Sequence, residues 1–143
     1  MEIRIATVDD ANDLLEMNTL FENDATLEII KKSIVENESE TVCIAHVDGK
    51  AVGFCCGRLV KSMCYSENRM DIEALFVKDE YRGQGIGKSL IQYLETTFIE
   101  RGIYHFHNGA YLSNLKALSL YASMGYLCNG EVVLEKSVER FPK

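Results

Sequence analysis

The stretch from Asp71 to Leu94 constrains the fold of this chain more than any other. It opens with an apolar run, Ile72–Val77, whose β-branched and aromatic residues are typical of a buried strand. Three glycines follow at alternate positions: Gly83, Gly85 and Gly87. Apolar residues then recur at helical spacing as far as Leu94, which predicts a helix that begins inside the glycine segment. Such a strand, loop and helix aim backbone N–H groups and the positive end of the helix dipole at one point, a typical phosphate or pyrophosphate site.

Three phosphate-binding motifs share this arrangement, and spacing separates them. A Walker A loop would end at residues 87–89, but Arg82 stands where its first glycine is required. A dinucleotide fingerprint could begin at Gly83 and Gly85, but Gly87 then comes one residue too early. The pattern Arg/Gln-x-x-Gly-x-Gly/Ala is filled at every position, by Arg82, Gly85 and Gly87.

A second motif occupies residues 114–126. It fills the pattern Asn-x-x-Ala-x-x-x-Tyr-x-x-x-Gly-Phe/Tyr at every position, with Asn114, Ala117, Tyr121, Gly125 and Tyr126. Through these two motifs, in this order, the chain resembles the GCN5-related N-acetyltransferase (GNAT) superfamily over nearly its whole length. The resemblance implies an enzyme that transfers the acetyl group of acetyl-CoA to a primary amine, by direct attack in a ternary complex.

Length and composition predict one globular domain over residues 1–143, since hydrophobic residues make up 47% and charged residues 26%. No apolar run approaches the roughly 20 residues of a membrane span, and the N-terminus is unlike a signal peptide. We therefore expect no membrane partner and a cytoplasmic location. The five cysteines form no Cys-x-x-Cys or Cys/His pattern, so we expect reduced, structural thiols and no metal site.

The net charge of −7 is unevenly distributed. Residues 1–41 hold eleven acidic and three basic side chains, whereas residues 42–143 hold eleven acidic and twelve basic ones. An acidic chain is a poor nucleic-acid ligand, because phosphate neutralisation needs clustered Lys and Arg. The acidic N-terminal third has two interpretations: it attracts a cationic amine, or it consists only of solvated helix faces.

Periodicity and turn chemistry predict the other elements. Strands are expected over residues 2–7, 41–47, 50–60, 69–77, 104–110 and 126–137. Helices are expected after a capping box at residues 7–10 as far as Phe21, over residues 26–37, from the glycine loop to Gly102, and over residues 113–124. Asp48-Gly49 predicts a two-residue hairpin. The order of these elements implies a mixed sheet with helices packed on it. The resemblance implies the α+β or α/β class and a GNAT fold, with a mostly antiparallel sheet of about six to seven strands flanked by about four helices.

The resemblance also implies where acetyl-CoA would bind. The strands ending at Val77 and near Ala110 would splay apart, and the backbone of Leu75, Phe76 and Val77 would pair with the pantetheine arm. One of these N–H groups would stabilise the developing oxyanion. The pyrophosphate would lie on the backbone of the loop, where side chains would block the approach. These residues are Arg82, Gly83, Gln84, Gly85, Ile86, Gly87 and Lys88.

Two residues of the second motif are candidates for roles in the reaction. By resemblance, Tyr121 is the general acid that protonates the departing thiolate, and Asn114 hydrogen-bonds the cofactor arm. A buried helical tyrosine and a plain helix N-terminal residue are the structural alternatives.

The acceptor amine, with a pKa of about 10.4, must lose a proton before attack. Glu73 is the preferred base, because alternation should direct it away from the face shared by Ile72 and Ala74. An acid in such a strand is costly unless paired or used, so a salt bridge or an edge position is the alternative. His105 and His107 on the next strand are second-choice bases.

The acceptor is less well defined. Ribosomal-protein acetyltransferases of this family carry a glutamate five residues before the motif asparagine, where this chain has Gly109. This departure, the acidic N-terminal third and Glu73 favour a small cationic amine such as an aminoglycoside, polyamine or amino sugar. A protein or peptide N-terminal or lysine acetyltransferase, a non-catalytic CoA-binding regulatory module and a nucleotide phosphotransferase stay as alternatives. The sequence does not indicate an oligomeric state, and the resemblance implies only that homodimers are common.

Overall fold

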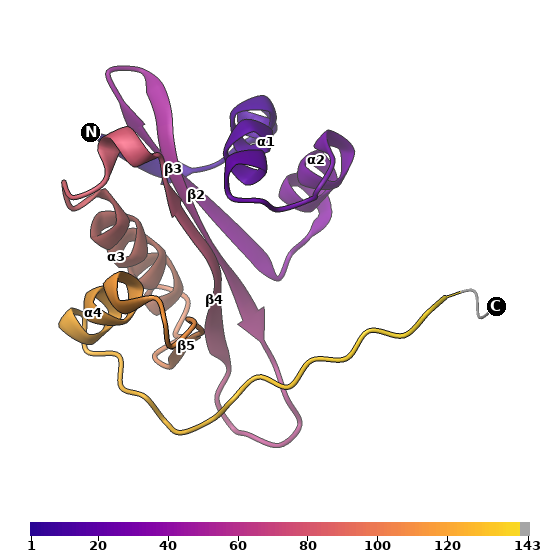
Figure 1. Cartoon of the computed structure of the whole chain (residues 1–143). Coiled ribbons are helices and arrows are strands. Elements are labelled where there is room, and N and C mark those ends of the chain that lie inside the picture. Colours follow the sequence, from indigo (N-terminus) through magenta and orange to yellow (C-terminus); the bar gives the residue numbers. More distant parts are fainter. Residues whose placement is uncertain (141–143) are drawn as a thin grey trace. The chain divides into compact units, whose positions relative to one another are not determined.

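The computed structural model describes residues 1–140, and the chain divides into two compact units, Met1–Gly109 and a second that begins at Ala110. The first unit is built on a five-stranded sheet with its strands in sequential order (Figure 1). The strands are β1 (Glu2–Ile5), β2 (Glu40–Val47), β3 (Lys50–Val60), β4 (Arg69–Val77) and β5 (Phe106–Asn108). The strands β1 to β4 are antiparallel neighbours, and β5 lies parallel to β4.

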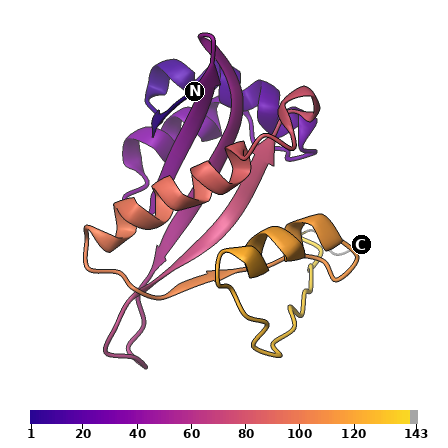
Figure 2. The same ribbon diagram turned by 90° about the vertical axis from the view of Figure 1, so that its left-hand side faces the viewer.

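Three helices cover the two faces of this sheet: α1 (Ala11–Leu20), α2 (Leu27–Glu36) and α3 (Ile86–Ile99). The helices α1 and α2 pack on one face, and α3 crosses the other (Figures 1 and 2). The α3 side is closely packed because β3 carries glycine there. A Cβ at Gly57 would lie 2.7 Å from Met70 Sδ and 2.9 Å from Leu94 Cδ2, closer than real side chains approach.

Several local predictions are confirmed. The β2–β3 hairpin turns through Asp48 and Gly49, both with positive φ (51° and 76°), as a two-residue primed turn requires. Asp10 accepts the Thr7 N–H at 2.8 Å, which fits the expected capping box and starts a 3-10 turn before α1. Thr26, expected as the first residue of the second helix, instead caps α2 by accepting the Ile29 N–H at 3.2 Å.

The second unit contains α4 (Leu115–Ser123), close to the predicted helix. The predicted final strand over residues 126–137 is wrong, because the structure has no regular secondary structure there. The mixed, mostly antiparallel sheet is as predicted, with five strands where about six to seven were expected. A strand is stabilised by its cross-strand neighbours, and the valines of this segment have none: Val132 is 77% exposed and Val133 89%. Within residues 1–140, no helix has both the length and the apolar character needed to cross a bilayer.

Candidate active site

A β-bulge on β4 places Glu73. Cys56 of β3 pairs with Ala74, and the next residue, Gly57, pairs with Ile72, so Glu73 is an extra residue without a partner on β3. A bulge of this kind bends the strand and changes the direction of a side chain. The bulge lies in the middle of β4, the strand that leads into the glycine loop.

The bulge also reverses the alternation of β4. Ala74 packs against the hydrophobic core under α1 and α2, whereas Met70 lies over Gly57 on the α3 side. Ile72 is two residues from Met70, so it shares the α3 side. The expectation that Ile72 and Ala74 face the same side is therefore wrong, because one inserted residue exchanges the faces.

The outer edge of β4 is only partly covered by β5. The parallel pairing with β5 runs from Met70 to Ile72 and stops there, as expected for strands that separate. Beyond Glu73, β4 keeps its pairing with β3 as far as Val77. Residues 73–77 therefore present an edge that β5 does not pair.

Alternation decides which backbone groups point to this edge. The Lys78 N–H donates to the Val52 carbonyl at 2.8 Å, so Phe76, two residues earlier, also directs its backbone groups toward β3. Leu75 and Val77 lie between these positions and direct their N–H and C=O groups outward. The three residues expected to pair with the pantetheine arm are thus divided, and only Leu75 and Val77 have the required direction.

The glycine loop has the backbone geometry of an anion site. Gly83 and Gly85 adopt left-handed φ angles of 78° and 81°, and a Cβ added at either would meet no atom within 4 Å. The helix α3 then begins at Ile86, and the Ser89 N–H donates to the Gly85 carbonyl at 3.0 Å. The N–H groups before Ser89 belong to the first helical turn and have no acceptor in the helix. The loop residues therefore fit a pyrophosphate group.

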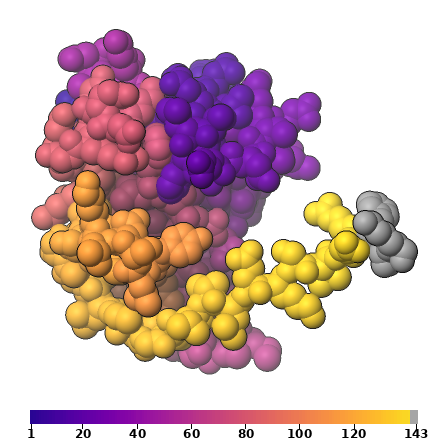
Figure 3. Space-filling view, viewed as in Figure 1, coloured from indigo at the N-terminus to yellow at the C-terminus, as the bar shows by residue number. Residues whose placement is uncertain are grey.

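The side chain of Arg82 links this loop to β4 by a hydrogen bond. Its Nε donates to the Val77 carbonyl at 2.9 Å, and its Nη1 lies 2.9 Å from Asp79 Oδ1. Its guanidinium carbon also stands 5.9 Å from the ring centroid of Phe76. The ring centroid of Phe21 lies 5.3 Å from that of Phe76, a contact that joins the end of α1 to β4. Figure 3 shows the surface of the loop region that follows β4 adjoining the surface of α1.

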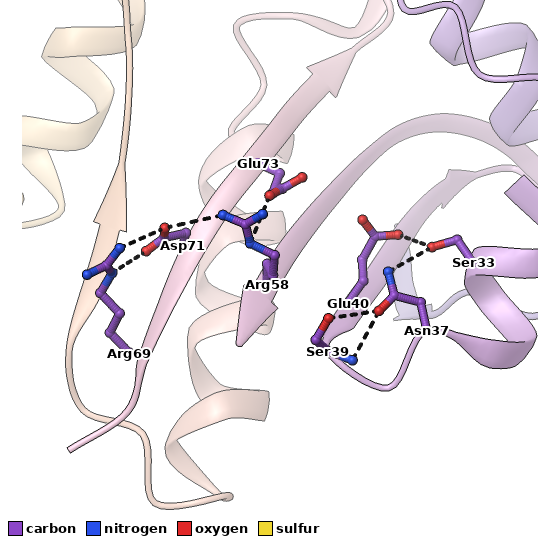
Figure 4. A network of polar contacts seen from close by, with 8 residues as sticks. All are labelled: Ser33, Asn37, Ser39, Glu40, Arg58, Arg69, Asp71 and Glu73. Carbon is purple, nitrogen blue, oxygen red and sulfur yellow. Dashed lines mark hydrogen bonds and ion pairs between the residues drawn. The ribbon is translucent and has the colours of Figure 1, made fainter. Parts of the chain in front are cut away.

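Glu73 lies in a network of charged side chains on the sheet (Figure 4). Its carboxylate, 37% exposed, is 3.2 Å from the Nε of Arg58, so the salt bridge weighed as an alternative is present. Asp71 receives two hydrogen bonds from Arg69, at 2.8 and 3.3 Å. Sequence reasoning missed Arg58 and Asp71, because the register of β3 against β4 is needed to bring them to Glu73.

His105 and His107 contact each other. Their Nε2 atoms are 3.0 Å apart, so one ring donates and the other accepts, and their centroids are 4.8 Å apart. His107 lies on β5 beside Asp71, and His105 immediately precedes the strand. Each second-choice base is therefore already engaged with the other.

In the second unit, Asn114 and Tyr121 lie at the start and near the end of α4. The Oδ1 of Asn114 accepts the Ala117 N–H at 3.1 Å, so its structural role as an N-cap is present. This leaves the side-chain amide nitrogen as the group that could donate to a ligand. Tyr121 is buried, and its ring centroid lies 5.7 Å from that of Tyr126.

The thiols of the sheet are structural. Burial raises the pKa of Cys43 to about 12 and raises that of Cys55 well above its usual value. Burial and the nearby carboxylates of Glu40 and Glu73 raise the pKa of Cys56 to about 12. The reactive thiolate is therefore scarce at neutral pH. Among residues 1–140, no group of three or more His, Cys, Asp or Glu side chains could hold a metal ion.

Comparison with known proteins decides between the phosphate-binding families. The model of the acetyltransferase (GNAT) family matches residues 8–126, which include both motifs. The chain belongs to this family. The GNAT chain is 28% identical over 133 residues to an uncharacterized N-acetyltransferase of Archaeoglobus fulgidus, covering 86% of this chain and 90% of that one.

Solved structures share the GNAT fold. An aminoglycoside acetyltransferase from an uncultured soil metagenomic sample superposes with a TM-score of 0.83 at 20% identity, over 97% of this chain and 96% of that one. A ribosomal-protein-alanine N-acetyltransferase from Brucella melitensis superposes with a TM-score of 0.81 at 17% identity, over 96% and 100%. The GNAT chain is thus an N-acetyltransferase by family, and the two neighbours differ in acceptor.

Proposed function

We propose that this enzyme transfers the acetyl group of acetyl-CoA to the primary amine of a small cationic acceptor, such as an aminoglycoside, a polyamine or an amino sugar. The observation that carries the proposal is the edge of β4 over residues 73–77, which β5 does not pair. Along it, the outward backbone groups of Leu75 and Val77 lie between Glu73 and the glycine loop. When bound, acetyl-CoA supplies the acetyl group as a thioester whose thiolate is a tolerable leaving group, with a thiol pKa of about 8.5.

The residues that would hold acetyl-CoA follow from this edge. The N–H and C=O groups of Leu75 and the N–H group of Val77 would pair with the pantetheine arm as with an added strand, while the Val77 carbonyl keeps its hydrogen bond from Arg82. The N–H groups from Gly83 to Lys88 would bind the pyrophosphate, helped by the dipole of α3. A fixed N–H on the β4 edge would also stabilise negative charge on the acetyl oxygen, an interaction worth about 3–4 kcal/mol in other enzymes.

Glu73 is the proposed base. The bulge sets it apart from the regular alternation of β4, two residues before the outward N–H of Leu75. A carboxylate there can accept the proton that the acceptor ammonium must lose. Its partner Arg58 cannot serve, because a guanidinium stays protonated. His105 and His107 stay second choices, since each ring already engages the other.

Tyr121 is the proposed general acid, which would deliver a proton to the departing thiolate. Its burial on α4 suits a hydroxyl that must hold one direction. The side-chain amide nitrogen of Asn114 would hydrogen-bond the cofactor arm, while its oxygen keeps the N-cap contact with Ala117.

Charge supports the choice of acceptor. Residues 1–41, which include α1 and α2, carry eleven acidic and three basic side chains, and these two helices cover the face of the sheet that carries Glu40 and Arg58. Long-range attraction to such a surface would raise the local concentration of a cationic amine. The family glutamate of ribosomal-protein acetyltransferases is Gly109 here.

The test is acetyl-CoA turnover, followed by thiol release, against aminoglycosides, polyamines, amino acids and N-terminal peptides. The proposal predicts turnover with one of the cationic small amines. Turnover with peptides alone would assign a protein or peptide substrate instead. CoA binding without turnover on the whole panel would favour a non-catalytic module.

A further inference from the structure

Arg58 contacts two carboxylates on the sheet, while Glu40 on the neighbouring strand turns toward Ser33 (Figure 4). Glu40 on β2 and Asp71 on β4 are its cross-strand partners in register. Glu73 comes two residues after Asp71, at the bulge. Two acids, Asp71 and Glu73, therefore lie within 3.9 Å of one guanidinium, although a cross-strand pair needs only one of them.

The distances show that Arg58 pairs with Glu73 more closely than with Asp71. Its Nε is 3.2 Å from Glu73, whereas its Nη2 is 3.9 Å from Asp71, beyond hydrogen-bonding distance. Asp71 already accepts two hydrogen bonds from Arg69, and Glu40 accepts one from the Ser33 hydroxyl at 2.6 Å. Among residues 1–140, the carboxylate of Glu73 has Arg58 as its partner.

The Arg58–Glu73 ion pair is weak enough for another cation to replace Arg58 beside the carboxylate. Glu73 is 37% and Arg58 52% exposed, and ion pairs this open to water stabilise a protein little. An acceptor ammonium that gives its proton to Glu73 brings a second cation to a carboxylate that already holds the Arg58 guanidinium, so the two cations compete for it. Arg58 has a second carboxylate, Asp71, within 3.9 Å to which it can shift.

We propose that Arg58 is a positioning residue that controls access to Glu73. In the free enzyme its guanidinium occupies the cation position beside the carboxylate. The acceptor ammonium displaces it toward Asp71, so the acceptor must compete with an internal cation. This inference rests on the proposed function, because it takes Glu73 as the group that meets the acceptor. It implies selection for acceptors with several positive charges over singly charged amines.

Equilibrium binding of spermidine, measured by calorimetry without acetyl-CoA, tests this directly. Removing the competitor in Arg58→Gln should tighten spermidine binding by about two- to fivefold, the range expected for an exposed ion pair. The same substitution in a Glu73→Gln background should change binding by less than about 1.5-fold, because no carboxylate is then released. Arg69→Gln is the matched control, since it removes one charge from the same network at a residue bound to Asp71.

Equal effects of Arg58→Gln in both backgrounds, or an equal effect of Arg69→Gln, would show that Arg58 acts only through net charge and would overturn the proposal. Unchanged or weaker binding in Arg58→Gln, or no spermidine binding by any variant, would also overturn it. The Arg58 Nε–H resonance of the unaltered protein, assigned with Arg58→Lys, gives a second measurement and should shift on adding spermidine. Turnover is measured separately. If the effect of Arg58→Gln on spermidine binding depends on Glu73 but no acetylation is detected, the proposed acetyl transfer is rejected and the exchange of cations at Glu73 is not.

Discussion

The Nε of Arg82 donates a hydrogen bond of 2.9 Å to the carbonyl oxygen of Val77, the last residue of β4. The arginine of the glycine motif thus joins the loop to the strand that the cofactor arm would follow. Its side chain positions the backbone N–H groups, and Asp79 holds it from the other side at 2.9 Å.

Replacing Arg82 with Ala should therefore weaken CoA binding by about tenfold, because the loop loses a charge-assisted hydrogen bond to the strand. Calorimetric titration with CoA would measure the effect. Arg82→Lys keeps the charge without the Nε donor and should restore only part of the affinity. A lysine variant with full affinity would mean that charge alone matters.

Gly85 and Gly49 form a matched pair for testing the anion site. Both have left-handed φ angles, 81° and 76°, and a Cβ at either would meet no atom within 4 Å. Substitution of either by Ala should lower the free energy of unfolding by about 1–2 kcal/mol, from backbone strain alone. Only Gly85→Ala should also weaken CoA binding. Equal CoA affinity in the two variants would place the pyrophosphate elsewhere.

Tyr121→Phe tests the general acid. The substitution keeps the buried ring and removes the hydroxyl, so turnover should fall by about ten- to a hundredfold while CoA affinity stays within a factor of two. The loss should be modest for acid catalysis, because a thiolate leaves without much assistance. Steady-state rates and CoA titration would be compared. A parallel loss of CoA affinity would instead indicate a role in binding.

Asp10 gives the protein a pH-dependent contribution to stability. The bidentate guanidinium of Arg4, at 2.6 and 2.7 Å, holds the pKa of this buried carboxyl below its usual value, with help from the Thr7 N–H. The contribution is complete above the unfolded-state pKa of about 3.9 and is lost as the pH falls through the lower folded-state pKa.

Asp10→Asn should therefore lower the free energy of unfolding by about 2 kcal/mol at pH 7. The difference from the unaltered protein should shrink below about pH 4, as Asp10 becomes protonated in both states. Urea unfolding at several pH values would measure it. A difference that stays constant down to pH 2 would mean that the carboxylate charge is not what stabilises this contact.

Local chemistry made much of the first unit predictable. The Asp48-Gly49 turn, the capping box at residues 7–10 and the glycine motif each depend on a few neighbouring residues, and the structure has all three. The bulge at Glu73 was not predictable, because β4 itself holds no glycine or proline and the bulge arises only from pairing with β3. It reversed the expected faces of Ile72 and Ala74.

Arg58 and residues 126–137 both show that sequence patterns do not predict contacts made by strand pairing. Arg58 is fifteen positions from Glu73 in sequence and reaches it only through the register of two strands. Residues 126–137 have strand-like composition, yet composition alone does not supply a neighbouring strand. Contacts made by pairing were therefore the part that sequence patterns could not supply.

The most direct test of the account compares the initial rate of amine acetylation by the unaltered enzyme and by Glu73→Gln, with the acetylated amine identified by mass spectrometry. The account predicts that the unaltered enzyme acetylates a cationic amine and that Glu73→Gln is slower by about a hundredfold, with CoA affinity unchanged. Equal rates in the two proteins, or no acetylated amine from the unaltered enzyme, would contradict it.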